Sequence, residues 1–366
     1  MDIDQSLLAR AVSRARRPDD ACARILVRLH RQVLGFLTMV LTNEDITSAA
    51  ILDAVRSQLA APLARHLAVD GVSLATAVRQ NGGGREKCGY RVGAGPQEPI
   101  SVVVCTRDRD ESLAICLKLL QQLHCAAFEV VVVDNAPSTS ATRDCFLRMV
   151  GDDARFRYVE EPVAGLSRAR NRGLAEAGSR WVAFTDDDVQ VDPWWLRGIA
   201  TGRARDASVG CVTGLVPPAE LDNAPQQYFD RRFSWGTRVE PQVYSLADRR
   251  GLSSLYPYSA GLFGTGANFA VDRQLMLDLG GFDEALGAGS PAGGGEELDV
   301  FVRVLRADRS LAYEPSAVAW HHHRSDPRAL RQQLFHYGAG LTAFLTKYVI
   351  DSRTTAEILI RLPQGA

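Results

Sequence analysis

The sequence predicts an α/β fold, Rossmann-like, with a mostly parallel mixed sheet flanked by helices and a small α+β unit in front of it. Residues 99–105 and 128–133 are apolar runs of strand length, and the pattern over 112–124 between them is that of an amphipathic helix. The second run contains four consecutive valines, which is typical of a strand buried on both faces of a parallel sheet. A strand, a helix and a strand within about 30 residues form a right-handed βαβ unit.

Length and composition exclude several classes of protein. At 366 residues, with 46% hydrophobic residues, the chain has material for one large domain with appendages. A formal net charge of -1 gives no general attraction to nucleic acid or to an anionic membrane, so we expect no nucleic-acid partner. The seven cysteines include no CxxC pair, which favours reduced thiols over a disulfide framework or a zinc site. Because no signal peptide or spanning apolar run is visible, we expect a cytoplasmic protein, either free or at the inner face of the plasma membrane.

The first 80 residues are expected to form a separate α+β unit. Residues 24–30 and 33–41 have the character of two strands around a tight turn at Arg31-Gln32. Helical spacing follows over 47–67, where Pro62 should kink the helix or split it in two. The glycine-rich stretch 81–97 then has the composition of a flexible linker.

An acidic triplet follows a buried apolar run in the main domain. Residues 181–185 end directly in Asp186, Asp187 and Asp188, which is typical of a strand that delivers carboxylates to the carboxyl edge of a parallel sheet. Three adjacent carboxylates repel one another and lose hydration there, so a divalent cation carrying phosphate oxygens is a natural counterion. The alternative is an Asp-rich turn that caps the next helix.

Other polar residues are expected along the same edge. Thr106 and Arg107 follow the first strand, and Asp134 follows the second, where it can bind a nucleoside N–H or hydroxyl or else cap a helix. The helix that opens at Gly165 carries three arginines, of which Arg170 points away from the other two. Guanidinium groups suit a diphosphate, although a solvated basic helix face is the alternative.

The second half of the domain holds further candidates. Residues 217–258 are rich in proline and aromatic residues and have little periodicity, which favours either an acceptor-binding loop or plain surface packing. Glu296 and Glu297 open a helix, where an acidic residue either acts as a general base or complements the helix dipole. The strand over 311–320 ends in three histidines, of which at most two share one side.

Four motifs in order resemble those of the family 2 glycosyltransferases of GT-A fold. The resemblance covers about residues 98–325, which leaves 326–366 as a helical extension that covers the core, pairs with a second subunit or lies on a membrane. The motifs are Cys105-Thr106-Arg107-Asp108-Arg109, Val132-Val133-Asp134-Asn135, Gly165-Leu166-Ser167-Arg168-Ala169-Arg170-Asn171 and Phe184-Thr185-Asp186-Asp187-Asp188.

The resemblance implies a metal-dependent, inverting transfer of a sugar from a UDP-, GDP- or dTDP-linked donor to an unknown acceptor. It implies that Glu297 is the general base, although the family commonly has Asp at this position, so that Glu296 remains an alternative. It further implies a site with Mn²⁺ or Mg²⁺ on Asp188 and His321, with His323 as the second candidate ligand. The donor contacts that it implies come from Thr106, Arg107, Asp134, Arg170, Asp186 and Asp187. The alternatives are a nucleotidyl- or phosphoryl-transfer enzyme and an inactive sugar-binding scaffold.

Overall fold

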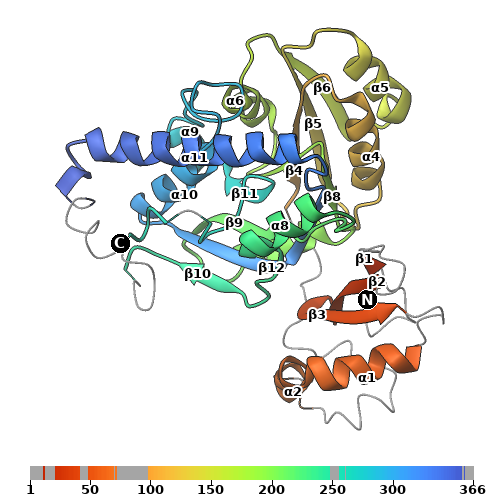
Figure 1. Cartoon of the computed structure of the whole chain (residues 1–366). Helices are drawn as coiled ribbons and strands as arrows, with labels where there is room; N and C mark the ends of the chain where they lie inside the picture. The colour runs from red at the N-terminus through yellow and green to blue at the C-terminus, as the bar shows by residue number, and fades with distance from the viewer. Residues whose placement is uncertain are drawn as a thin grey trace.

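In the computed structural model of the chain, the structure describes residues 11–12, 21–41, 48–69, 71, 98–247, 255–259, 261–356 and 358. The predicted linker over 81–97 lies outside these residues. The described part forms an N-terminal unit, at the lower right of Figure 1, and a larger α/β domain.

The N-terminal unit is a three-stranded antiparallel sheet with two helices on one face (Figure 1). Its elements are β1 Ala11–Val12, β2 Ala21–Leu29, β3 Gln32–Leu41, α1 Ser48–Gln58 and α2 Ala60–Val69. The predicted helix is indeed two helices, because the break falls at Leu59 and places Pro62 in the first turn of α2, where its missing N–H costs little. The turn lies one residue earlier than predicted, since His30 and Arg31 both have positive φ angles.

The larger domain is built on a nine-stranded sheet in the order β10-β12-β9-β11-β7-β4-β5-β6, with β8 paired to β12. Its β6-β5-β4-β7 half is parallel, as the βαβ pattern predicted, whereas β11 runs antiparallel to both of its neighbours. The strands are β4 Ile100–Thr106, β5 Phe128–Asn135, β6 Phe156–Glu161, β7 Trp181–Asp186, β8 Val189–Val191, β9 Val209–Leu215, β10 Gln242–Tyr244, β11 Asn268–Asp272 and β12 Ser310–His321.

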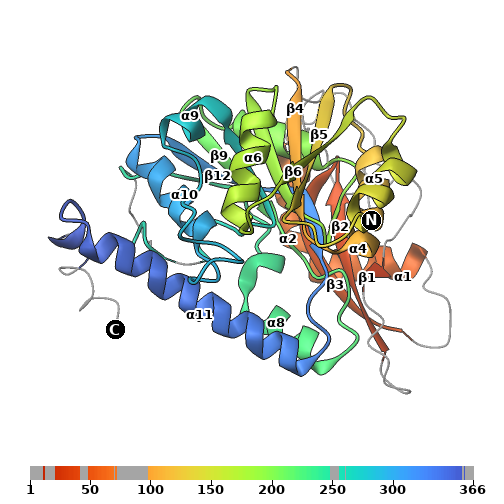
Figure 2. The same cartoon turned by 90° about the horizontal axis from the view of Figure 1, so that it is seen from above.

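Helices cover both faces of this sheet (Figure 2). Val102 and Val104 face the core beneath α4, α5 and α7, while Val103 faces the core beneath α6, α9 and α10, since successive strand residues point to opposite faces. The helices are α4 Asp110–Gln121, α5 Ala141–Val150, α6 Leu166–Glu176, α7 Trp195–Arg203, α8 Ala224–Arg232, α9 Arg273–Asp278, α10 Glu296–Arg306 and α11 Pro327–Ile350.

The expectation of a long irregular segment over 217–258 is wrong in part. Its first section folds into α8, which begins at the N-cap Asn223, whose side chain accepts from the Gln226 N–H. The periodicity was hard to recognise because α8 has few apolar residues and buries only Gln226 and Phe229.

The C-terminal helix α11 lies across α10 and α8 (Figure 2). Its Phe344 and Tyr348 are buried against the core, so of the three predicted roles the described residues favour covering the domain. None of the helices in the described part of the chain combines the length and the apolar character needed to cross a lipid bilayer.

Candidate active site

The carboxyl ends of β4, β5 and β7 lie beside one cleft of 1210 Å³. Strand register places Cys105 opposite Asp186 and Thr106 opposite Asp134, which brings the first, second and fourth motifs to one edge of the sheet. All predicted site residues except Asp134 line the cleft: Thr106, Arg107, Arg170, Asp186, Asp187, Asp188, Glu296, Glu297 and His321.

Arg109 pairs with two members of the acidic triplet, and the sequence analysis did not single it out. Its guanidinium lies 2.7 Å from Asp187 Oδ1 and 3.0 Å from Asp188 Oδ2. Arg324 adds a longer contact of 3.5 Å to Asp188. Arg109 ends the first recognised motif and Arg324 directly follows the three histidines, so their position beside polar strand ends was the available signal. Arg107, which was predicted to contact the donor, is half-exposed and lies 4.0 Å from Asp108.

The three aspartates differ in their pKa values. Burial raises the pKa of Asp186 to about 7 and that of Asp187 to about 6, although a neighbouring arginine opposes the shift in each case. At Asp188 burial also acts to raise the pKa, but His321 in its protonated form and the charges of Arg109 and Arg324 outweigh it, so that the pKa lies below its usual value. Asp188 is therefore the member of the triplet that stays ionised most readily.

Arg170 forms the centre of a buried ion network. Its side chain is only 2% exposed and lies 2.8 Å from Glu296 Oε1 and 3.3 Å from Asp186 Oδ1. It also donates to the Gly266 carbonyl at 3.0 Å, which ties the loop before β11 to α6. Arg170 thus joins the acidic strand end to the start of α10, and in this structure its donors point at protein carboxylates.

Glu297 lies beside this network but is not part of it. Burial, followed by the like charge of Glu296, raises the pKa of Glu297 to about 8. Glu296 Oε2 is buried without a hydrogen-bond partner in the described chain, whereas its Oε1 is held by Arg170. Between the two candidates, Glu297 is the carboxylate that forms no ion pair with the described residues, and once ionised it is a stronger base than an ordinary glutamate.

His321 is the histidine that faces the acidic triplet. Its Nε2 lies 3.9 Å from Asp188 Oδ1, and its Nδ1 lies 3.0 Å from Nδ1 of His323. His322 points elsewhere, toward Glu220, as strand alternation requires. Burial lowers the pKa of His321, which favours the neutral imidazole that binds metals.

The donor set at Asp188 and His321 fits a divalent metal shared with a ligand. Among the described residues no group of three or more His, Cys, Asp or Glu side chains is arranged to hold a metal by itself. A carboxylate oxygen and an imidazole nitrogen nevertheless converge on the cleft beside cationic side chains that already compensate Asp188. Metals that act on nucleotides commonly take one or two protein ligands and complete their shell with phosphate and water.

Asp134 lies behind the cleft wall and does not line it. Its side chain is fully buried, and the Tyr158 hydroxyl donates to its Oδ2 at 2.7 Å. Its Oδ1 has no hydrogen-bond partner in the described part of the chain. The neighbouring Asn135 lines the cleft and holds the loop before α6 by accepting from the Gly165 N–H. Thr106 is likewise engaged with the protein, since its hydroxyl donates to Asp187 at 2.7 Å.

Four aromatic side chains form a further part of the cleft lining. Phe233 and Trp235 stack at 4.8 Å, and Tyr337 of α11 meets both edge-on or tilted. Phe229 closes the group by packing on the His323 ring at 4.6 Å. We call Phe229, Phe233, Trp235 and Tyr337 the aromatic wall. The aromatic residues over 217–258 therefore divide between two roles, because Tyr244, Tyr256 and Tyr258 are buried in the core.

Comparison with known proteins identifies the domain. Residues 101–270 match the profile of Glycosyl transferase family 2. The chain is 26% identical over 253 residues to "Pre-mycofactocin glycosyltransferase" of Mycobacterium tuberculosis, covering 68% of this chain and 48% of that protein. It is 26% identical over 167 residues to "N-acetylgalactosaminyltransferase 7" of Drosophila melanogaster, covering 44% of this chain and 27% of that protein. The chain thus spans about half the length of the first relative and about a quarter of the second.

The fold has a solved counterpart. Mannosyltransferase PcManGT from Pyrobaculum calidifontis, determined in complex with GDP-Man and Mn²⁺, superposes with a TM-score of 0.52 at 18% identity, over 73% of this chain and 69% of that one. At this identity the likeness concerns the fold. Together with the sequence match it shows that the chain carries a family 2 glycosyltransferase domain of GT-A fold.

Proposed function

We propose that the chain is a metal-dependent, inverting glycosyltransferase that moves a sugar from a nucleotide-sugar donor to an acceptor hydroxyl. The observation that supports this most is the convergence of two functional groups on one cleft. Asp188 and His321 lie at the carboxyl edge of the sheet, and Glu297 opens α10 on the same cleft. Asp188 and His321 suit a divalent metal that carries a diphosphate, and Glu297 suits the removal of a proton from an attacking hydroxyl.

Glu297 is the proposed general base. It accepts the proton of the acceptor hydroxyl while the oxygen attacks the anomeric carbon and the nucleoside diphosphate leaves from the opposite face. One displacement of this kind inverts the configuration. A carboxylate with a pKa near 8 is a stronger base than an ordinary glutamate, because burial and Glu296 disfavour its charged form. Glu296 is proposed as a positioning residue, since its ion pair with Arg170 holds the start of α10.

The acidic edge is the proposed donor site. Asp188 and His321 would hold a divalent metal, Mn²⁺ or Mg²⁺, which when bound would supply positive charge beside the leaving diphosphate. Asp186 faces the donor ribose or sugar, and the hydrogen bond from Arg170 orients the Asp186 carboxylate. Asp187 accepts a hydrogen bond from the Thr106 hydroxyl and so holds the acidic triplet against the end of β4.

The remaining donor candidates lie at the nucleoside end. Arg107 is free to turn toward a diphosphate, since half of its side chain is exposed. Asp134 enters the proposal as an acceptor for a nucleoside N–H or hydroxyl, because one of its oxygens lacks a partner in the described residues. That contact requires a movement of Tyr158, which now covers the carboxylate.

The aromatic wall is the proposed acceptor side. Phe233, Trp235 and Tyr337 present ring faces and edges to the cleft, and such surfaces pack well on the C–H faces of sugars. The wall lies next to His323 rather than next to Asp134, so an acceptor bound there approaches from the side opposite the nucleoside end. The acceptor hydroxyl is thereby directed toward Glu297.

Calorimetric titration with UDP, GDP and dTDP, each with and without Mn²⁺, tests the donor site. We expect one nucleotide to bind tightly in a metal-dependent manner, and we expect Asp188→Asn to lose the metal-dependent part of the affinity. Asp152→Asn is the matched control, because it makes the same change at an exposed carboxylate after α5 that does not line the cleft. Absence of binding to all three nucleotides, or equal binding by wild type and Asp188→Asn, would refute the assignment.

A further inference from the structure

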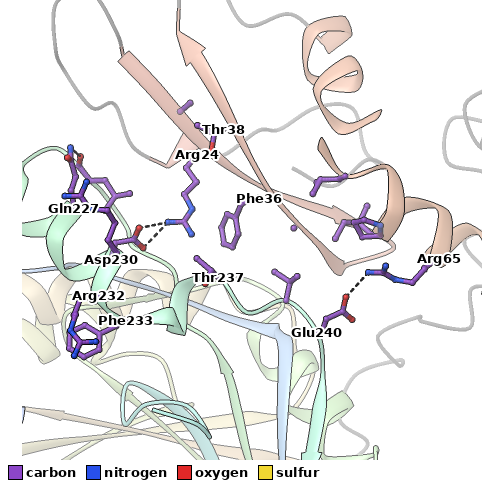
Figure 3. A pocket seen from close by; sticks show the side chains of 18 residues that line it. Arg24, Phe36, Thr38, Arg65, Gln227, Asp230, Arg232, Phe233, Thr237 and Glu240 are labelled. Atoms are coloured by element: carbon purple, nitrogen blue, oxygen red, sulfur yellow. Dashed lines mark hydrogen bonds and ion pairs between the residues drawn. The ribbon is translucent and has the colours of Figure 1, made fainter. Parts of the chain in front are cut away.

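A second cavity, of 1040 Å³, lies between the N-terminal unit and the glycosyltransferase domain (Figure 3). Residues of β2, β3 and α2 line one side of it, and residues of α8 and of the segment before β10 line the other. Figure 3 shows Arg24, Phe36 and Thr237 around its middle, with Arg65 and Glu240 at one end. Neither the family match nor any of the predicted site residues accounts for this cavity.

The cavity has walls that are fixed relative to each other. Arg24 donates two hydrogen bonds to Asp230 of α8, at 2.9 and 2.8 Å (Figure 3). Arg28 makes a similar two-bond contact with Asp192 beyond β8, at 3.0 and 2.6 Å. Leu26 and Val33 of the N-terminal sheet also pack against an apolar cluster from β9 and β12. Buried two-bond ion pairs and an apolar contact hold the N-terminal unit in one position, so the cavity is a built feature.

The cavity carries an excess of positive charge. Among its lining residues, Arg24 is paired with Asp230 and Arg65 with Glu240. Arg231 and Arg232 are exposed, and neither forms an ion pair with any of the described residues. Two arginines are therefore available for an anionic ligand, and arginine recognises carboxylates by paired hydrogen bonds.

The cavity adjoins the active-site cleft. Arg232 and Phe233, at the end of α8, line both of them. Phe233 is also a member of the aromatic wall, where we place the acceptor. A long acceptor that enters the cleft along this wall therefore reaches the second cavity over Phe233.

Arginine and aromatic side chains lie next to each other at two places in the cavity. The Arg24 guanidinium lies 4.5 Å from the centre of the Phe36 ring, and that of Arg232 lies 5.8 Å from the centre of Phe233. Because Arg24 is already paired with Asp230, the pair of Arg232 and Phe233 is the one that matches a uronic acid, which carries a rigid C–H face and a carboxylate on the same ring. A flexible acidic peptide offers the carboxylate but no rigid apolar face.

We propose that the cavity between the N-terminal unit and α8 binds an acidic, uronate-containing part of the acceptor, remote from the attacking hydroxyl. This inference rests on the proposed glycosyl transfer, and it gives the N-terminal unit a role in acceptor recognition. The anionic groups meet Arg231 and Arg232, while the sugar faces pack on Phe36 and Phe233.

Binding of hexagalacturonate to the full chain, measured by calorimetry at low and at moderate salt, tests the proposal. The fully methyl-esterified hexamer is the neutral comparison, and a hexaglutamate peptide is the acidic one without sugar rings. Arg231→Glu changes a residue that lines only this cavity, and Arg148→Glu makes the same change on α5, away from both cavities. Thr38→Trp fills the cavity from an exposed strand position without changing charge.

We expect hexagalacturonate to bind at least about tenfold more tightly than its ester, and Arg231→Glu to weaken it about tenfold, as for loss of one charge-assisted contact. Thr38→Trp should abolish binding, Arg148→Glu should not change it, and nucleotide binding should stay the same in every variant. Absence of hexagalacturonate binding, an equal loss in Arg148→Glu, or tighter binding of hexaglutamate would overturn the proposal. Failure of the wild type to bind any nucleotide would refute glycosyl transfer instead, since the oligosaccharide titration is independent of the donor.

Discussion

The contact between Arg28 and Asp192 should contribute much more to stability than the exposed ion pair that also links the two units. The Arg28 and Asp192 side chains are 15% and 5% exposed and share two hydrogen bonds. Substitution Arg28→Ala removes the guanidinium and leaves the Asp192 carboxylate buried, where the Trp194 N–H donates to it at 3.0 Å. Since removal of one partner of a buried pair typically costs about 3–5 kcal/mol, we expect a loss near the lower end, about 3 kcal/mol.

The pair formed by Arg65 and Glu240 provides the matched comparison. It has a similar N–O distance of 2.9 Å and joins the same two units, but its side chains are 61% and 71% exposed. Arg65→Ala should therefore cost less than about 1 kcal/mol, because solvent screens the charges and the two flexible side chains lose entropy when they pair. The two variants differ in burial rather than in the type of charge removed.

Urea denaturation followed by circular dichroism measures both variants. For a domain of this size, about 3 kcal/mol corresponds to a fall of roughly 6–12 °C in Tm, so thermal scans give a second reading. Arg28→Lys keeps the charge but not the two-bond geometry, and it should recover only part of the loss. Equal destabilisation by Arg28→Ala and Arg65→Ala would refute the argument that burial determines the contribution of these contacts.

Three further predictions concern catalysis and packing. Glu297→Gln should lower the rate of glycosyl transfer, measured by nucleotide release, by about 10²–10⁴-fold. Nucleotide binding, measured by calorimetry, should not weaken. If Glu296→Gln lowers the rate more than Glu297→Gln does, the base role passes to Glu296. In the wild type, the rate of transfer at low donor concentration should rise with pH through about 8, because Glu297 accepts a proton only when ionised and burial raises its pKa to about 8. A pH–rate profile that is flat from about pH 6 to 9 would contradict this assignment. Gly198→Ala should destabilise the domain by on the order of several kcal/mol, since a Cβ at this position of α7 would lie 2.4 Å from the Ala317 backbone nitrogen. Gly338→Ala in α11 is the control, because its Cβ would meet nothing within 4 Å, and this substitution should be neutral or stabilise by about 0.5–1 kcal/mol. Equal melting temperatures for these two variants would disprove the packing argument.

The recognisable parts of the site are those whose chemistry is local in sequence. The apolar run that ends in Asp186, Asp187 and Asp188 predicted a buried strand with acids at its carboxyl end, and β7 has this arrangement. Glu296 and Glu297 were predicted to open a helix, and α10 begins at Glu296. Each of these features needs only the period of one element and the residues that follow it.

Other features of the site depend on which elements pack together, so the sequence alone did not reveal them. Arg109 and Arg107 both follow the first strand, and only the packed structure selects Arg109 as the partner of the aspartates. Asp134 is a residue type suited to binding a nucleoside, but it lies behind Tyr158, since β6 places the Tyr158 side chain over its carboxylate. Arg170 is a residue type suited to binding phosphate, and in the folded chain it is buried between the carboxylates of Asp186 on β7 and Glu296 on α10.

The sequence by itself therefore determined the first strand–helix–strand unit, the parallel half of the sheet and the acidic edge, because hydrophobic periodicity and strand-end residues are local properties. The tertiary structure alone decided how the N-terminal unit is placed, which arginines are paired and where the second cavity lies. Arg28 and Asp192 are 164 residues apart in the chain, and Arg24 and Asp230 are 206 apart. No local pattern encodes such a contact, since it exists only once both elements have been positioned by the core between them.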